Sequence, residues 1–90
     1  MSEDVKLLSE PTNFAVVQLR DRKYPGVVFQ GDSLSSMLQR VERMNKLLHE
    51  EDVSELRAEI EEMQEHLFEI LVHYEAICKS NNIGLPYSKK

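Results

Sequence analysis

Apolar residues recur with helical periodicity along residues 53–78. Their spacing alternates between three and four positions without interruption, which is the a/d heptad pattern that places them on one stripe of a helix. The stripe consists of Val53, Leu56, Ile60, Met63, Leu67, Ile70, Tyr74 and Ile77. Past its middle the stripe widens, because Phe68, Leu71 and Val72 join it. We therefore predict a long helix over about residues 53–79, whose second half contacts more than one neighbour.

A second stretch with helical periodicity covers about residues 33–48. Its apolar positions are Leu34, Met37, Val41, Met44 and Leu48, flanked by Leu38 and Leu47. Asp32 or Ser33 is a good N-cap, and Asp52 with Glu55 forms a pattern close to a capping box for the long helix. The short break between the helices predicts an antiparallel hairpin. Facing a and d positions gives the pairs Leu48–Leu56, Met44–Ile60, Val41–Met63, Met37–Leu67 and Leu34–Ile70.

Upstream of the helices, about residues 13–30 predict a β-hairpin. Runs rich in β-branched and aromatic residues, FAVVQL and VVFQ, flank a polar connection and a Tyr24-Pro25-Gly26 turn. Residues 5–8 add a candidate edge strand. Both faces of the hairpin are apolar, so each face needs a cover: one is the helical layer, and the other is a candidate contact with a second copy.

These elements predict one α+β domain over residues 1–90. It comprises a two- or three-stranded antiparallel sheet, the antiparallel two-helix hairpin with its long C-terminal helix, and a tail over 80–90. Asn81, Asn82 and Gly84 supply the stop of the long helix.

Charge and composition limit the kinds of partner and cellular setting that we expect for this chain. The net charge is −5, and half of the 16 acidic residues lie within 50–65, so a direct nucleic-acid partner is not expected. Cys78 is the single cysteine, which excludes an internal disulfide and fits a reducing, cytoplasmic setting. Because it lies near a helix C-terminus among apolar residues, we expect its thiol to be buried and inert. We expect no signal peptide and no membrane span. A chain this short is marginal alone, so a homo-oligomer, a dimer first of all, is expected.

One helix face carries residues that are able to ligate metals. Glu62, His66, Glu69 and His73 follow one another at helical spacing, and imidazole and carboxylate are ligands of first-row metals. The Glu-x-x-His spacing of di-iron bundles and the His-Glu-x-x-His pattern of zinc proteases are both absent. A solvated face with Glu–His contacts is the simpler interpretation. We therefore expect no metal, no other cofactor and no catalytic residue, with these four as the only candidates.

The stretch YPGVVFQGDSL, residues 24–34, resembles the strand-to-helix signature of HicB-type antitoxins. Pro25, Gly26, Gly31, Asp32, Ser33 and Leu34 carry the match. The resemblance implies a β-β-α unit and a protein that neutralises a toxic partner; the family's DNA-binding C-terminal segment has no counterpart here. With NFAVVQL ahead of it, the stretch is more similar to a family of short uncharacterised bacterial proteins with no assigned activity.

Together these features favour a small acidic protein-binding module of antitoxin-like or immunity-like type rather than an enzyme. The alternatives are a metal-binding helical protein or enzyme that uses Glu62, His66, Glu69 and His73, and a structural subunit that associates with itself.

Overall fold

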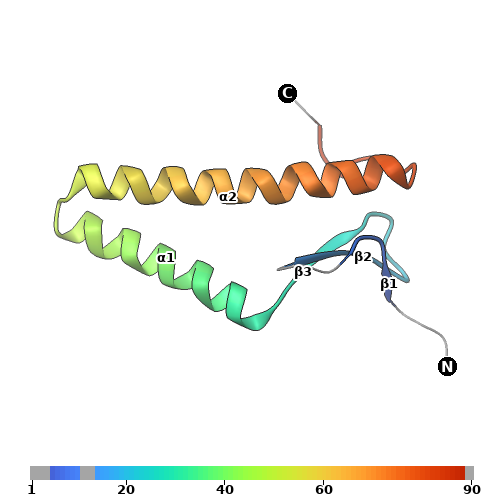
Figure 1. Cartoon of the computed structure of the whole chain (residues 1–90), viewed down its shortest axis with the longest axis horizontal. Helices are drawn as coiled ribbons and strands as arrows, with labels where there is room; N and C mark the ends of the chain where they lie inside the picture. Colours follow the sequence, from blue (N-terminus) through green and yellow to red (C-terminus); the bar gives the residue numbers. More distant parts are fainter. Residues whose placement is uncertain (1–4, 11–13, 89–90) are drawn as a thin grey trace. The chain divides into compact units, whose positions relative to one another are not determined.

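The computed structural model describes residues 5–10 and 14–88. It has three strands followed by two helices, as Figure 1 shows, so the predicted α+β class is confirmed. The predicted start of the β-hairpin at residue 13 and the last two residues of the tail lie outside the described residues. The elements are β1 (Val5–Leu7), β2 (Phe14–Leu19), β3 (Gly26–Phe29), α1 (Gly31–His49) and α2 (Val53–Ser80).

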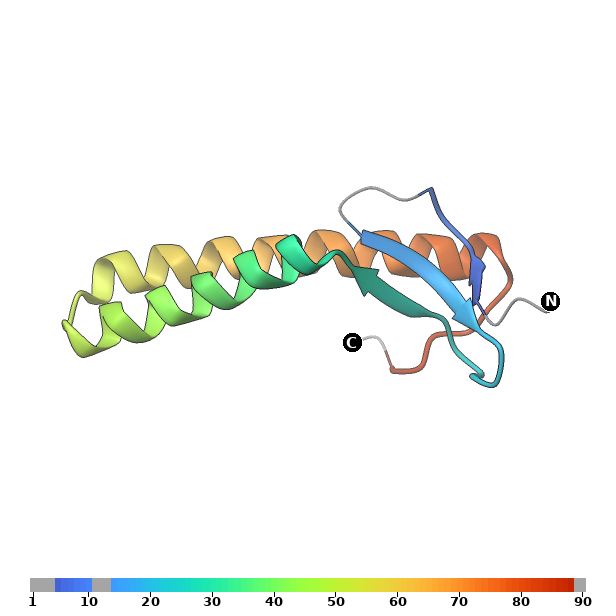
Figure 2. The same cartoon turned by 90° about the horizontal axis from the view of Figure 1, so that it is seen from below.

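The strands form one antiparallel sheet in the order β1-β2-β3. The edge strand predicted over residues 5–8 is therefore present as β1, and β2 is the central strand (Figure 2). The chain divides into two compact units. Residues 1–30 with 71–90 form the sheet unit, and residues 31–70 form the helical hairpin. The long helix α2 is continuous and contributes to both units, as predicted.

In the sheet unit, the core lies between one face of the sheet and the last turns of α2. Val16 and Cys78 are 0% exposed and Tyr74 is 6% exposed. Half-buried side chains surround this centre: Leu8, Val27, Ile77, Ile83 and Leu85. The expectation that Cys78 is buried is confirmed. Only part of the widened apolar stripe of α2 is buried, because Leu71 and Val72 are 42% and 47% exposed.

Polar groups inside this core have partners. The Tyr74 hydroxyl donates a hydrogen bond of 2.7 Å to the Pro25 carbonyl, which anchors the turn before β3 to α2. The buried Ser9 hydroxyl accepts a 2.9 Å bond from the Val16 backbone N–H, where the pairing of β1 with β2 has ended. Burial, and then its hydrogen bond with Cys78, raises the pKa of Tyr74 to about 12. The neutral phenol is therefore the form that the folded unit stabilises.

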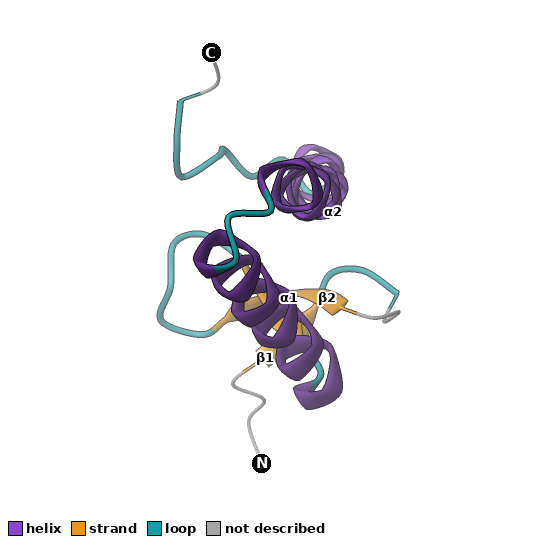
Figure 3. Ribbon diagram, turned by 90° about the vertical axis from the view of Figure 1, so that its left-hand side faces the viewer, coloured by secondary structure: helices purple, strands orange, loops and turns teal. Residues whose placement is uncertain are grey.

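The helical hairpin is antiparallel (Figures 1 and 3). Local hydrogen bonds cap the end of α1 and the start of α2. The Asp52 carboxylate accepts the Glu55 backbone N–H at 3.2 Å, so the predicted cap of α2 is confirmed. At the end of α1, the N–H groups of Glu51 and Asp52 donate to the carbonyls of Leu48 and Leu47 in a Schellman pattern. Glu51 has the left-handed φ of 61° that this pattern requires.

The end of α2 repeats this arrangement with an asparagine. Asn82 has a φ of 57°, and the N–H groups of Asn82 and Ile83 donate to the carbonyls of Lys79 and Cys78. The expected stop at the asparagine pair is confirmed, and Ile83 continues from it onto the core.

The predicted pairing of the two helices is wrong in its rotation. In each of the five predicted pairs one member is exposed, including Leu34 at 60%, Leu48 at 61% and Ile60 at 48%. The half-buried and buried positions instead follow a neighbouring stripe on each helix: Met37, Arg40, Met44, Leu47, Leu56, Glu59, Met63, His66 and Ile70. The two helices also separate toward the start of α1, as Figure 1 shows. The helix contact therefore lies to one side of the apolar stripe, and that stripe stays exposed.

Candidate functional site

The exposed face of the sheet is the first candidate surface. Opposed residues of antiparallel strands share a face, and residues alternate between faces along a strand. Because Val16 and Phe14 face α2, where Phe14 meets the ring of His73 at 5.3 Å, the odd-numbered residues of β2 face away from the helix. The strand register then gives the members of this outer sheet face: Val5, Leu7, Ala15, Val17, Leu19 and Val28.

Every side chain of the outer sheet face is apolar, and four of the six are exposed. Val5, Leu7, Leu19 and Val28 have exposed fractions of 47%, 52%, 41% and 51%. An antiparallel sheet with a wet face normally carries polar residues there. The predicted two-sided apolar character of the sheet is therefore present, with α2 covering one face and the outer sheet face exposed within the described chain.

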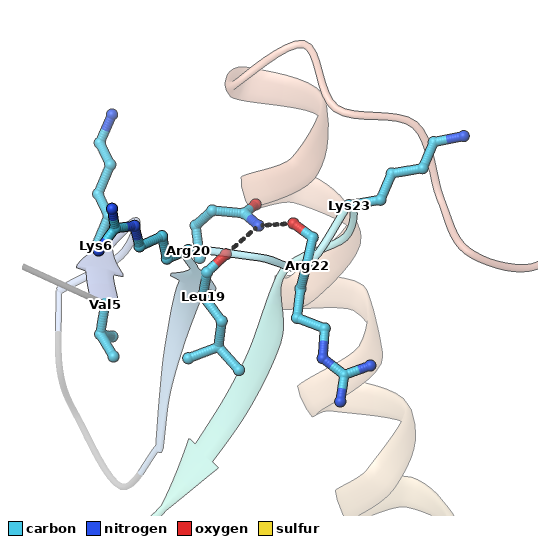
Figure 4. Close-up of a pocket in the computed structure, with 7 residues that line it drawn as sticks. Val5, Lys6, Leu19, Arg20, Arg22 and Lys23 are labelled. Atoms are coloured by element: carbon cyan, nitrogen blue, oxygen red, sulfur yellow. Dashed lines mark hydrogen bonds between the residues drawn. The ribbon is translucent and has the colours of Figure 1, made fainter.

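Basic residues gather at one end of the outer sheet face. A hollow of about 650 Å³ lies at this end, and Figure 4 draws the side chains around it. Its lining residues are Val5, Lys6, Gln18, Leu19, Arg20, Arg22 and Lys23. The described residues of the strand region, 5–10 and 14–30, carry four bases and two acids, whereas the whole chain has a net charge of −5. The sequence pattern predicts only a polar connection over residues 20–23, although the bases gathered there in an acidic chain are a signal for this site.

The side chains around this hollow do not converge on one point. Val5, Leu19 and Arg22 extend toward one side in Figure 4, whereas Lys6 and Lys23 extend toward the other. The Lys23 ammonium lies 5.3 Å from the centre of the Tyr24 ring. The Gln18 amide donates to the carbonyls of Leu19 and Arg22 and so holds the turn in place. This arrangement does not enclose a small anion, but it places Arg22 beside the apolar residues of the outer sheet face.

The four candidate metal ligands do not form a site. Among residues 5–10 and 14–88, no three His, Cys, Asp or Glu side chains lie close enough to hold a metal ion. His73 packs edge-on against Phe14, and His66 is half-buried along the hairpin contact. Glu62 and Glu69 are exposed. The geometry gives His73 a packing role in the sheet unit.

The predicted turn and cap residues have structural contacts. Pro25 supplies the carbonyl that Tyr74 binds. The helix α1 begins at Gly31, earlier than predicted, so Asp32 lies in its first turn and accepts the Ser33 backbone N–H at 2.8 Å. Neither Gly26 nor Gly31 has a positive φ, and a Cβ at either position would meet nothing within 4 Å. The structure therefore gives no steric reason for glycine at either position.

No helix in the described part of the chain combines the length and apolarity needed to span a membrane.

Comparisons with known proteins give one match. Residues 1–87 match the model of a family described as "Family of unknown function (DUF6959)", and the chain belongs to this family. The search of curated proteins and the search of solved structures each gave no match. The expected membership of an uncharacterised family is thus confirmed, whereas the resemblance to HicB-type antitoxins receives no support from these comparisons.

Proposed function

We propose that this member of the DUF6959 family is a protein-binding module that acts by covering a surface of another protein. In this respect it is of antitoxin-like or immunity-like type and catalyses no reaction. The observation that carries the proposal is the outer sheet face, which is apolar at all six positions and exposed at four of them. A large exposed apolar patch with a polar rim is typical of a site of protein–protein interaction.

The rim of the outer sheet face defines the chemistry of the partner. Arg22 extends to the same side as Val5 and Leu19, and a guanidinium is the side chain best suited to paired hydrogen bonds with a carboxylate. The partner therefore presents an apolar centre with a carboxylate at its edge. The buried thiol of Cys78, which forms no disulfide, is compatible with a reducing compartment such as the cytoplasm.

Site-specific photo-crosslinking in cells that express the protein tests this proposal. A photo-reactive amino acid replaces Leu7, which lies on the outer sheet face, or Lys6, which neighbours it in the same strand but points to the opposite face. We expect a discrete crosslinked product with another protein from position 7 and none from position 6. No product, equal products at both positions, or a product of two copies of this chain contradicts the proposal.

A second measurement tests the predicted rim contact on the purified pair. Replacement of Arg22 by Glu puts like charges together, so we expect the dissociation constant measured by calorimetry to rise at least about tenfold. The matched control is Lys46→Glu, which makes the same charge change on an exposed residue of the helical hairpin. Equal weakening by Arg22→Glu and Lys46→Glu contradicts a specific role of Arg22.

A further inference from the structure

One side of the helical hairpin carries a second apolar surface, distinct from the outer sheet face. Its members are at least 48% exposed, and Val53 reaches 64%. We call this set the hairpin stripe: Leu34, Leu38, Val41, Leu48, Val53, Ile60 and Leu67. By contrast, Leu47 and Ile70 are the only buried hydrophobic side chains of residues 31–70, all of which the structure describes.

The members of the hairpin stripe lie on the same side of the two helices. Successive residues of a helix are rotated by 100°, which places the stripe about 90° from the half-buried contact residues on each helix. Since α1 and α2 are antiparallel, these two rotations point to the same side of the pair. Arg43 marks the opposite side, where its guanidinium lies 3.7 Å from the Glu55 carboxylate and 3.5 Å from that of Glu59. The hairpin therefore has one apolar and one charged side.

A hollow on α2 indicates that the missing neighbour is a helix. Val53, Leu56, Arg57 and Ile60 line it together with Glu61, and its volume is about 340 Å³. The first four stand at positions i, i+3, i+4 and i+7, the set that forms a hole for a side chain from a facing helix. An antiparallel helix pair with one such apolar side is half of a four-helix bundle.

Charge favours a second copy of this chain as the occupant. At 100° per residue, Glu42 on α1 and Arg57 on α2 are the charged residues nearest to the hairpin stripe, whereas the bases of α1 and most of the acids of α2 point away from it. A twofold axis parallel to the helices places α1 of each copy against α2 of the other, and it brings Glu42 of one copy to the same edge of the contact as the partner's Arg57. It also brings Leu48 to the level of the partner's hollow, because both lie close to the connection between the helices. The same chain thus supplies both the projecting side chains and the hole.

The area of the hairpin stripe matches what a stable dimer needs. A large aliphatic side chain offers on the order of 100 Å² of apolar surface, so seven that are about half exposed offer roughly 400 Å² per copy. A standard interface buries about 800 Å² per partner, of which about 60% is apolar. We propose that two copies of this chain associate through their hairpin stripes to form a four-helix bundle. The proposal uses a different surface from the proposed function and does not depend on it.

Sedimentation equilibrium of the full chain at micromolar concentration tests the proposal. We expect the wild type to have twice the chain mass of 10.5 kDa. An aspartate within the contact would be buried without a partner, so Leu38→Asp and Ile60→Asp should raise the dissociation constant at least about tenfold. The matched control is Phe68→Asp, because Phe68 is 64% exposed on α2 but lies outside the stripe.

Circular dichroism shows whether each variant keeps its helices, and Leu38→Ala with Ile60→Ala replaces any aspartate variant that does not. A wild type that sediments as a monomer overturns the proposal. Stripe variants that remain dimeric overturn it as well, as does a Phe68→Asp variant that dissociates as readily as the stripe variants. The crosslinking experiment at position 7 reads a different face, so its result stands whichever of these outcomes is found.

Discussion

The two units of this chain bury their apolar residues to very different extents. In the sheet unit, Val16 and Cys78 are fully buried, and the Tyr74 hydroxyl has a carbonyl partner within the same unit. In the helical hairpin, only Leu47 and Ile70 are buried, while the seven members of the hairpin stripe are exposed. A local core with satisfied polar groups stabilises the first unit from within. The second unit buries little apolar surface of its own and keeps an apolar side exposed.

The two units also differ in charge. The strand region carries an excess of bases, whereas the start of α2 carries six acids and one base within residues 53–70. Two exposed apolar surfaces with surroundings of opposite sign suit two different contacts. The two exposed apolar surfaces therefore differ in the charge around them, as the two proposed contacts require. Substitutions inside each unit test how much its own packing and hydrogen bonds stabilise it.

The largest expected effect comes from the centre of the sheet unit. Val16→Ala removes two buried methyl groups from a fully buried position and should lower the free energy of unfolding by about 2–3 kcal/mol. Val28→Ala makes the same change on the outer sheet face, where Val28 is 51% exposed, and should cost less than about 0.5 kcal/mol. Urea denaturation followed by circular dichroism measures both. Similar losses from the two variants would show that the outer sheet face is already covered.

Removal of the Tyr74 hydroxyl should have the next largest effect. Tyr74→Phe keeps the ring but leaves the Pro25 carbonyl without its hydrogen bond, which should cost about 1–2 kcal/mol. Tyr87→Phe is the control, because the Tyr87 hydroxyl bonds to Glu75 at an exposed site. Hydrogen exchange of the β3 amides should increase in the Tyr74 variant alone. Unchanged exchange there would contradict an anchoring role for this bond.

The same phenol predicts a loss of stability in alkali. Its pKa is raised from 10.0 to about 12 in the folded chain, so the folded state holds its proton more tightly than the unfolded state does. The resulting stabilisation is complete below pH 10 and is lost as the pH rises through about 12. Burial and the bond to Glu75 also raise the pKa of Tyr87 to about 12. Urea midpoints at a series of alkaline pH values should fall less steeply in Tyr74→Phe than in the wild type.

In the hairpin, the cap of α2 should contribute less than the core of the sheet unit. Asp52→Ala removes the carboxylate that accepts the Glu55 backbone N–H and should cost about 1 kcal/mol. Asp52→Asn keeps an accepting oxygen and should retain most of this stability. Thermal unfolding compares the three proteins at a fixed concentration. An equal loss in both variants would assign the effect to charge at the helix N-terminus rather than to the hydrogen bond.

The smallest expected effect is a gain. Glu51 adopts a φ of 61° at the end of α1, a conformation that strains any residue with a Cβ. Glu51→Gly should therefore stabilise the chain by about 0.5–1 kcal/mol, and thermal unfolding measures the shift. Glu50→Gly, one residue earlier and without a positive φ, should give no such gain. A stabilisation of equal size at both positions would point to the lost negative charge instead.

Much of the secondary structure could be predicted because local sequence determines it. The cap at Asp52 and the stop at Asn82 each depend on residues within a few positions of one another. The nearly continuous apolar run of β2 likewise predicted a sheet with two apolar faces. The hollow beside Arg22 was missed, because it forms only when residues 5–6 meet residues 18–23 across the β1–β2 pairing.

The sequence by itself determined which segments are helices and strands, where they end, and that each helix has a broad apolar stripe. Only the tertiary structure decided which part of each stripe lies in the contact between the two helices. A stripe that is wider than one contact allows more than one rotation of the helix about its axis, and local interactions do not choose between them. Here Met37, Met44 and Met63 lie along the contact between the helices, whereas Leu38, Val41 and Ile60 face outward. That choice depends on contacts between residues far apart in the chain, and it leaves an apolar side exposed.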